Sequence, residues 1–325
     1  MDIRGFPTSL PEFQRIFPND EACARYLEII RWPNGFTCPK CTHIGEPYRF
    51  TTRSFIVLRC RSCKANISLT AGTVMQSSHM PLSTWFWGAY LLTTQVPGQS
   101  AVQFQRQLAI SRYETAFQIL HKLRAGMVRP ERDTIGAEHP VEVDECLVGG
   151  ETRGEGRGIH HKSVVIGAVE VRSRRNDGKS HRRKVYAGRL RLRVVPDRSA
   201  NVLTGFVKDN VTQGAVLRTD GWTGYPGLGK IYRHEALTLG GDPDKAEAHL
   251  PMIHLVFSNL KTWIKGTHHS RIEPKHLQAY LNEYVFRFNR RFYPMTAFHS
   301  VLGIASRIVP PTYAQLYSGE WEHAA

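Results

Sequence analysis

The segment Cys38-Pro39-Lys40-Cys41 is followed, after 18 residues, by Cys60-Arg61-Ser62-Cys63. Zinc binds four thiolates tetrahedrally, and each Cys-x-x-Cys loop turns its two sulfurs toward one point. The protein fills all four ligand positions, so we expect a structural zinc ion (Zn²⁺) with no open site for a catalytic water. A ribbon this small cannot bury enough apolar surface to fold alone, and zinc supplies roughly 10–16 kcal/mol of apparent binding free energy.

Two other interpretations of these cysteines stay open at the level of the sequence. They are two unrelated pairs, or a redox dithiol, although a redox site needs only one pair. His43 is a further ligand candidate beside four cysteines that already satisfy the ion. Lys40, Arg61 and Lys64 flank the two loops, and we expect them to face DNA phosphates.

The composition indicates a folded, basic protein with a polyanionic partner. The 325 residues suffice for about two or three domains, and the 41% hydrophobic content favours a globular core over disorder. Lysine and arginine number 43 against 28 aspartate and glutamate residues, which gives a net charge of +15. Nucleic acid is the commonest partner for such a surplus. A basic enzyme whose charge only aids solubility is the alternative.

The sequence also indicates where the protein works. No apolar run approaches the ~20 residues of a membrane span, and residues 1–5 contain no apolar signal region. We therefore expect a cytoplasmic, nucleoid-associated protein with no membrane partner and with reduced thiols. Under reducing conditions the six cysteines indicate metal binding or chance burial rather than disulfides. Cys23 and Cys146 lie outside the two Cys-x-x-Cys pairs.

Three segments are expected ahead of the largest domain: a helical lead-in over 1–35, the zinc ribbon over 36–74 and a helical DNA-binding segment over 75–135. In the lead-in, Asp20 is the expected N-cap of a helix that ends at Trp32-Pro33-Asn34-Gly35. In the helical segment, Ser111 is the expected N-cap of the second of two helices. This pair is a helix-turn-helix candidate, and a helical hairpin that only packs is the alternative.

Over residues 138–305 the pattern predicts a mixed sheet with flanking helices, which we expect to be the catalytic domain. The chain as a whole is therefore expected to be α+β and multidomain. A C-terminal tail follows over 306–325. Three successive strands predict an antiparallel meander, and a fourth strand follows a helix capped by Ser199. A basic hairpin turn over 172–178 joins the second strand to the third. The expected strands lie near 141–144, 163–171, 189–194 and 216–219, and two later helices near 252–264 and 275–291.

Asp144 and Asp220 are the candidate catalytic carboxylates, because each lies at a strand of this sheet. Carboxylates on adjacent strands can converge on divalent cations such as Mg²⁺, which prefers hard oxygen ligands. Paired ions activate an attacking oxygen and stabilise the leaving one in phosphoryl transfer. The alternative is a pair of ordinary strand-end aspartates. His254 and Lys261 lie seven residues apart on one face of a predicted helix, which we expect to point toward the aspartates.

Five blocks of the chain, in this order, resemble zinc-ribbon insertion-sequence transposases related to the Merlin superfamily of DNA transposons. The blocks are Arg31-Trp32-Pro33-Asn34-Gly35, Val141-Glu142-Val143-Asp144-Glu145 with Gly149-Gly150, Thr219-Asp220-Gly221-Trp222-Thr223-Gly224-Tyr225, Ser258-Asn259-Leu260-Lys261 with Gly266-Thr267-His268-His269, and the helix from His276 to Arg291. Each block is modest alone, but five in the right order are specific and cover most of the chain. The resemblance implies a ribonuclease H-like fold and metal-dependent cleavage and joining of DNA strands.

The resemblance also implies roles for individual residues. His254 stands where many related enzymes carry a third acidic residue, a glutamate, and some members carry Asn or His there with the following lysine. The implied set is therefore Asp-Asp-His-Lys, in which Asp144, Asp220 and His254 hold Mg²⁺ or Mn²⁺ and Lys261 neutralises a DNA phosphate. Neutral imidazole binds Mg²⁺ poorly and Mn²⁺ better, so His254 is alternatively a water-mediated ligand or a proton carrier.

The function expected from these residues is DNA transposition, with cleavage at the element's terminal inverted repeats and strand transfer into target DNA by a homodimer or higher homo-oligomer. Two other functions stay open. The histidine at the third position fits a catalytically inactive, transposase-derived zinc DNA-binding protein, and the same fold suits a structure-specific nuclease. Glu247 is a further candidate carboxylate, although Pro251 lies between it and the predicted helix.

Overall fold

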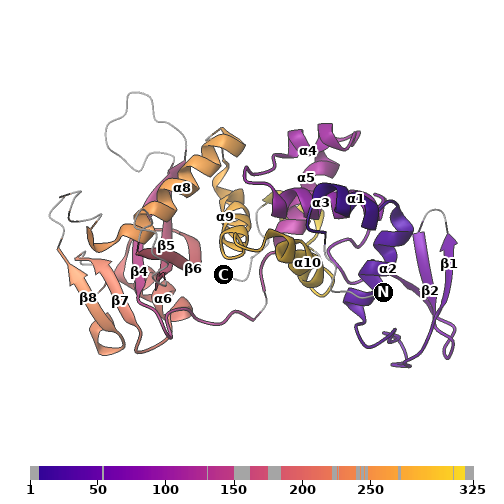
Figure 1. The fold of residues 1–325 in the computed structure, drawn as a ribbon, viewed down its shortest axis with the longest axis horizontal. Coiled ribbons are helices and arrows are strands. Elements are labelled where there is room, and N and C mark those ends of the chain that lie inside the picture. The colour runs from indigo at the N-terminus through magenta and orange to yellow at the C-terminus, as the bar shows by residue number, and fades with distance from the viewer. Residues whose placement is uncertain are drawn as a thin grey trace. The chain divides into compact units, whose positions relative to one another are not determined.

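The computed structural model describes residues 7–52, 55–129, 131–149, 162–174, 184–221, 225, 227–238, 242, 245, 248–269, 272–309 and 311–318. It divides into two compact units, one formed by residues 1–130 with 290–324 and the other by residues 131–289 (Figure 1). Helices, a small sheet and a larger mixed sheet are all present, so the predicted α+β, multidomain class is confirmed. In the described part of the chain, no helix is both long and apolar enough to cross a membrane.

Helices make up most of the first unit. They are α1 (Leu10–Ile16), α2 (Asp20–Arg31), α3 (Leu82–Thr94), α4 (Ala101–Gln107), α5 (Tyr113–Ala125), α10 (Pro294–Ala305) and α11 (Tyr313–Ser318). Aromatic side chains fill the core between them, and the rings of Phe17 and Phe86 lie 4.9 Å apart. Helix α10 packs on α3, α2 and α5. The ring centre of its Phe298 lies 5.7 Å from the ring centre of Phe13.

The position of α10 differs from the expected domain boundaries. The pattern over 138–305 predicted that this helix belongs to the catalytic domain, but residues 290–324 group with the N-terminal unit instead. The physical reason is tertiary. The backbone N–H of Val74 donates to Ala305 at 2.9 Å, and Phe298 is fully buried among aromatic rings of the first unit.

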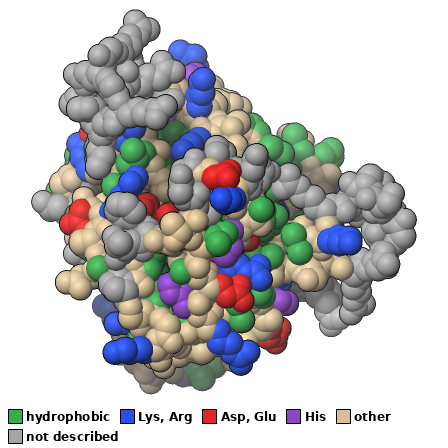
Figure 2. All heavy atoms as spheres, turned by 90° about the vertical axis from the view of Figure 1, so that its left-hand side faces the viewer, with side chains coloured by type: hydrophobic (Ala, Val, Ile, Leu, Met, Phe, Trp, Pro, Cys, Tyr) green, Lys and Arg blue, Asp and Glu red, His purple; other side chains and the backbone are tan. Residues whose placement is uncertain are grey.

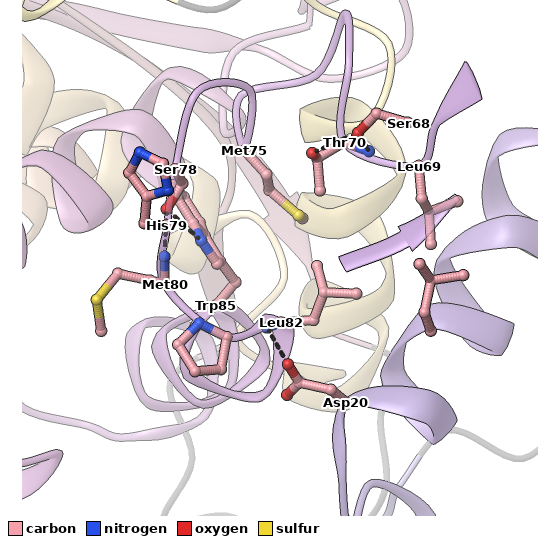
Figure 3. A pocket seen from close by; sticks show the side chains of 12 residues that line it. Asp20, Ser68, Leu69, Thr70, Met75, Ser78, His79, Met80, Leu82 and Trp85 are labelled. Carbon is pink, nitrogen blue, oxygen red and sulfur yellow. Dashed lines mark hydrogen bonds between the residues drawn. The ribbon is translucent and has the colours of Figure 1, made fainter. Parts of the chain in front are cut away.

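Two helix caps also differ from those predicted. Asn19, not Asp20, caps α2, since its side chain accepts from the N–H of Ala22 at 3.0 Å. The Asp20 carboxylate instead accepts from Leu82 at 3.1 Å and Ser83 at 2.9 Å, and so caps α3 (Figure 3). Helix α5 begins after Arg112 with no side-chain cap hydrogen bond, so the prediction for Ser111 is wrong.

The Asp20 carboxylate lies at the edge of a cavity of about 410 Å³ in the first unit (Figure 3). Trp85, Met75 and His79 are among the side chains that line it. The indole Nε1 of Trp85 donates to Ser78 at 3.3 Å, so the loop before α3 is tied to the helix that it precedes. Asp20 therefore joins the lead-in helix to the helical segment at this cavity.

The zinc-ribbon segment forms a three-stranded antiparallel sheet in the order β1-β2-β3. Its strands are β1 (Tyr48–Thr52), β2 (Phe55–Arg59) and β3 (Asn66–Ser68). The chain enters the ribbon through the predicted break, where α2 ends at Arg31 and Gly35 takes a φ of +95°, a conformation that favours glycine.

The second unit is built on a five-stranded sheet in the order β6-β5-β4-β7-β8. Its strands are β4 (Val141–Gly149), β5 (Lys162–Ser173), β6 (Val185–Val195), β7 (Val216–Asp220) and β8 (Arg233–Leu237). The first three pair antiparallel, whereas β7 runs parallel to both β4 and β8. The predicted meander and mixed sheet are confirmed, and β8 was not predicted. Residues 175–178 of the expected basic turn lie outside the described residues.

Helices cover both faces of this sheet (Figure 1). Helices α8 (Pro251–His268) and α9 (Pro274–Phe288) share one core with Cys146 and Val148 of β4. Helix α6 (Ala200–Asn210) shares the other with Val141 and Val143. This alternation along β4 assigns a face to each of its polar residues, because side chains two apart in a strand point the same way.

Candidate catalytic site and zinc site

Asp144 and Asp220 lie side by side on neighbouring strands. The parallel register pairs Val143 of β4 with Thr219 of β7, so the two aspartates come next on their strands. Neighbouring strands lie about 4.8 Å apart. Val143 and Thr219 face the α6 side, and the two aspartates therefore face α8. The predicted convergence of these carboxylates follows from the register of β4 and β7.

Helix α8 brings His254 to the same place. Nε2 of His254 lies 3.1 Å from Oδ2 of Asp144, and it is the donor because a carboxylate oxygen accepts hydrogen bonds. The other carboxylate oxygen of Asp144 accepts from the backbone N–H of Glu145 at 2.8 Å. The His254 side chain is 33% exposed and that of Asp144 is 16% exposed, so the pair is open to a ligand from solvent.

Glu142 holds the first turn of α8 against the sheet. Its Oε2 accepts from the backbone N–H groups of Met252 at 2.7 Å and Ile253 at 2.9 Å. An anion at a helix N-terminus satisfies amides that have no partner within the helix. The carboxyl is fully buried, and burial raises its pKa to about 7, against the opposing effect of the two backbone hydrogen bonds. Its Oε1 has no hydrogen-bond partner among the described residues.

Glu145 carries the third carboxyl of β4, and it lies on the face of the strand opposite to Glu142 and Asp144. It accepts a hydrogen bond from the hydroxyl of Tyr225 at 3.0 Å, and Nε of Arg198 lies 3.8 Å from its Oε1. Burial raises the pKa of Glu145, and the charges of Asp144 and Asp220 raise it further. Glu142, Glu145 and Arg198 lie outside the predicted catalytic set. Glu142 and Glu145 are recognisable in the sequence, because each is a charged residue among the apolar residues of a predicted strand. No such sequence pattern marks Arg198.

Lys261 lies on the exposed side of α8, two turns after His254. Burial raises the pKa of the Cys146 thiol to about 12, and the charge of Lys261 is the largest influence that opposes the rise. Since Cys146 follows Asp144 by two residues on the same face of β4, Lys261 belongs to the surroundings of the aspartates. Figure 2, viewed from the end of the molecule that carries β7 and β8, shows basic, acidic and histidine side chains intermixed.

The ligand atoms of Asp144, Asp220 and His254 suit a divalent cation, but they lie farther apart than the ligands of a fully formed metal site. Asp144 and Asp220 offer hard oxygen atoms, and His254 offers a nitrogen that Mn²⁺ accepts more readily than Mg²⁺. Among the described residues, only the four cysteines of the ribbon bring three or more ligand atoms within 4.8 Å of one another. Glu247 and the block Trp222 to Gly224 lie outside the described residues.

The four cysteine sulfurs have the spacing of a tetrahedral zinc site. The Sγ atoms of Cys38 and Cys63 lie 3.7 Å apart, and those of Cys41 and Cys60 lie 3.6 Å apart. Zinc–sulfur bonds of about 2.3 Å place tetrahedral ligands about 3.8 Å apart. A backbone hydrogen bond from His43 is the largest of the effects that lower the pKa of the Cys41 thiol to about 6, toward the thiolate form that zinc binds.

The two Cys-x-x-Cys loops have the same backbone geometry. The N–H of Cys38 donates to His43 at 2.9 Å, and the N–H of Cys60 donates to Ala65 at 3.0 Å. The residue after each second cysteine, Thr42 or Lys64, takes a φ of +58° and donates back to the carbonyl of the first cysteine. Two matched loops fit one shared ion, and the predicted structural zinc site is confirmed in its ligands.

Comparison with known proteins matches both units. Residues 136–289 match a family described as the ISXO2-like transposase domain, and residues 18–66 match the transposase zinc-ribbon domain. The chain is 25% identical over 300 residues to the uncharacterized protein in transposable element ISH50 of Halobacterium salinarum, and the match covers 84% of this chain and 94% of that protein. No solved structure matches.

Proposed function

We propose that this chain, a member of the zinc-ribbon insertion-sequence transposases of the ISXO2-like family, cleaves DNA at the ends of its element and joins the freed ends to target DNA. The observation that carries the proposal is the contact of 3.1 Å between Asp144 and His254, next to Asp220 on the neighbouring strand. All three residues lie within the region matched to a transposase domain. The order of the five strands, with the first three antiparallel, supports a ribonuclease H-like assignment.

The residues present fit the chemistry of phosphoryl transfer. Bound Mg²⁺ or Mn²⁺ activates an attacking oxygen and stabilises the leaving one. Asp144 and Asp220 would supply carboxylates to the ion and His254 a ring nitrogen, and Nε2 of His254 lies 3.1 Å from Oδ2 of Asp144. In the first step a water oxygen bonds to phosphorus while the bond from phosphorus to the 3′ oxygen breaks. The freed 3′ hydroxyl then attacks a target phosphorus, and the 3′ oxygen of the target strand leaves.

Lys261 neutralises the phosphate charge in this proposal. It lies on the exposed side of α8, two turns after His254. Positive charge beside a transferring phosphoryl group stabilises the charge that develops in the transition state. Two element ends are handled in one reaction, so the proposal includes a homodimer or a higher homo-oligomer on DNA.

Cleavage of labelled terminal-repeat DNA by the purified full-length protein, with Mg²⁺ or Mn²⁺, tests the proposal. Asp144→Ala and Asp220→Ala should each reduce cleavage to background while DNA binding persists. Asp209→Ala is the matched control, because this aspartate is 59% exposed on α6 and pairs only with Arg193 among the described residues. Normal cleavage by either active-site variant would overturn the assignment.

A second candidate function is motivated by His254 at the position where a glutamate is common. It is a transposase-derived DNA-binding protein without catalytic activity. That candidate predicts specific binding to the element's ends with no metal-dependent cleavage by the wild-type protein. The same assay also separates a structure-specific nuclease, which would hydrolyse branched DNA and leave no joined strands.

A further inference from the structure

The outward face of the zinc-ribbon sheet combines an exposed aromatic ring with cations that form no ion pair with any residue the structure describes. Cross-strand register pairs Tyr48 with Arg59 and Arg59 with Asn66, so these side chains share one face. Tyr48 is 50% exposed, and Arg59 and Asn66 are not buried either. The opposite face of the sheet is covered at β2 and β3, where Leu58 is fully buried and Ile67 nearly so.

Two further cations from the second cysteine loop extend this face. The guanidinium of Arg61 lies 4.7 Å from the centre of the Tyr48 ring, and Nζ of Lys64 lies 6.0 Å from it. Nε of Arg59 donates to the carbonyl of Lys64 at 3.2 Å, and Nζ of Lys64 donates to the carbonyl of Arg61 at 2.7 Å. Backbone and ring contacts therefore gather three positive charges around one tyrosine.

The charges on the two faces of the sheet differ. On the inward face Arg49 forms ion pairs with Glu28 at 2.6 Å and Glu46 at 3.0 Å. On the outward face Arg59, Arg61 and Lys64 have no carboxylate partner among the described residues. Cations that have no carboxylate partner and surround an exposed aromatic ring are complementary to the phosphates of a polyanion.

We propose that this outward face, defined by Tyr48, Arg59, Arg61, Lys64 and Asn66, binds DNA. The three cations contact phosphates, and the Tyr48 ring contacts the sugar or base between them. The inference rests on the proposed function for its choice of partner, and it assigns the zinc ribbon a specific DNA-binding surface. Zinc then has a positioning role, because it holds Arg61 and Lys64 in the loop beside β1.

Fluorescence anisotropy of labelled duplex with the full-length, zinc-loaded protein tests the surface. Each lost phosphate contact should lower the slope of log binding constant against log salt concentration by about 0.9. At 0.1 M salt this slope change corresponds to about eightfold weaker DNA binding. Arg61→Ala and Lys64→Ala should each show this change. Arg25→Ala is the charge-matched control, since this arginine pairs with Glu21 on the surface of α2, and it should bind as wild type.

Tyr48 variants separate the ring from its hydroxyl. Tyr48→Ala should weaken binding about fivefold, because the ring no longer holds the guanidinium of Arg61 beside it or contacts the DNA, whereas Tyr48→Phe should bind as wild type. The bound zinc is measured in every variant. If Arg61→Ala or Lys64→Ala loses zinc, the cations serve the thiolates and the inference is overturned. It is also overturned if Tyr48→Ala changes the oligomeric state and leaves DNA affinity intact, because the face then contacts a second copy.

Failure of this inference and failure of the proposed function give different results. If the wild-type protein cleaves DNA and the face variants bind normally, only the DNA-binding surface is wrong. If binding depends on Arg61 and Tyr48 but the wild type does not cleave, only the catalytic proposal is wrong.

Discussion

The buried carboxylate of Glu142 accepts a hydrogen bond of 2.7 Å from the backbone N–H of Met252, which ties β4 to the first turn of α8. Asp144 follows two residues later on the strand, and His254 follows two residues later on the helix. The contact between Asp144 and His254 at 3.1 Å is thus set by the attachment between Glu142 and Met252. Glu142 is a positioning residue that lies in neither the exposed site nor the predicted catalytic set.

Replacement of Glu142 by alanine should destabilise the second unit and impair cleavage. Two N–H groups at the start of α8 lose their acceptor, and each unsatisfied buried group costs about 1–3 kcal/mol. Glu142→Gln keeps an oxygen acceptor and should retain most of the cleavage activity. Urea unfolding and the cleavage assay measure both effects. Equal activity in the alanine and glutamine variants would contradict the positioning role.

The pH dependence of stability should carry the signature of Glu142. Its pKa is raised to about 7 in the folded state from 4.5, so the folded protein holds the proton more tightly than the unfolded chain. The stabilisation is fully present below pH 4.5 and is lost as the pH rises through about 7, by up to about 3 kcal/mol. The difference in unfolding free energy between wild type and Glu142→Gln, measured from pH 4.5 to 8, should fall as the pH rises.

His254 should set the preference of the site for its metal ion. Imidazole favours Mn²⁺ over Mg²⁺, and a carboxylate is a harder donor that suits Mg²⁺. His254→Glu should therefore lower the ratio of cleavage rates with Mn²⁺ and Mg²⁺, and His254→Ala should lower both rates. Rates under single-turnover conditions provide the measurement. An unchanged ratio in His254→Glu would mean that the imidazole does not act at the metal.

Much of the fold could be predicted from local pattern. The apolar alternation in β4 and β5 predicted the meander, because each strand buries alternate residues on the two faces of the sheet. Strand β8 was not predicted, because it lacks the apolar alternation of a half-buried strand: Arg233–Leu237 lies at the edge of the sheet, and only His234 is partly buried. The grouping of α10 with the first unit could not be predicted, because its partners include aromatic rings of α1 and α3, which lie far away in the chain.

The candidate site was predictable where residue type carried the signal. Two aspartates on strands and a histidine and a lysine on one helix face are visible in the sequence, and the register and the contact of His254 bring three of them together. The supporting residues were not predictable. Burial of Glu142 and the link from Tyr225 to Glu145 at 3.0 Å depend on pairings across the sheet.

Zinc removal should unfold the ribbon. The four thiolates replace a core that the segment lacks, and roughly 10–16 kcal/mol of apparent binding free energy is lost with the ion. Metal analysis should find one zinc per chain in the wild type and none in Cys60→Ser. Cys23→Ala is the matched control, because this cysteine is buried in α2, outside the four-cysteine cluster, and it should keep its zinc. A chain that stays fully folded without zinc would contradict a structural role.

Gly167 should be intolerant of even one methyl group. It pairs with Asp144 across β4 and β5, and an added Cβ would come within 2.9 Å of Ile253 Cδ1 and of Leu192 Cδ2. Overpacking of this kind costs about 1–3 kcal/mol. Relief of the clash requires the side chains of Ile253 and Leu192 to shift, and a shift of Ile253 disturbs the first turn of α8, which carries His254. Gly167→Ala should therefore lower both the unfolding free energy and the cleavage rate.

Gly205 provides the matched control for this substitution. It lies in α6, where an added Cβ would meet nothing within 4 Å. Alanine is favoured over glycine in a helix by about 1 kcal/mol, so Gly205→Ala should be neutral or stabilising and should cleave as wild type. Urea unfolding of both variants, together with single-turnover cleavage, separates the two positions. If Gly167→Ala is as stable and active as Gly205→Ala, the close approach of α8 to β5 does not position His254.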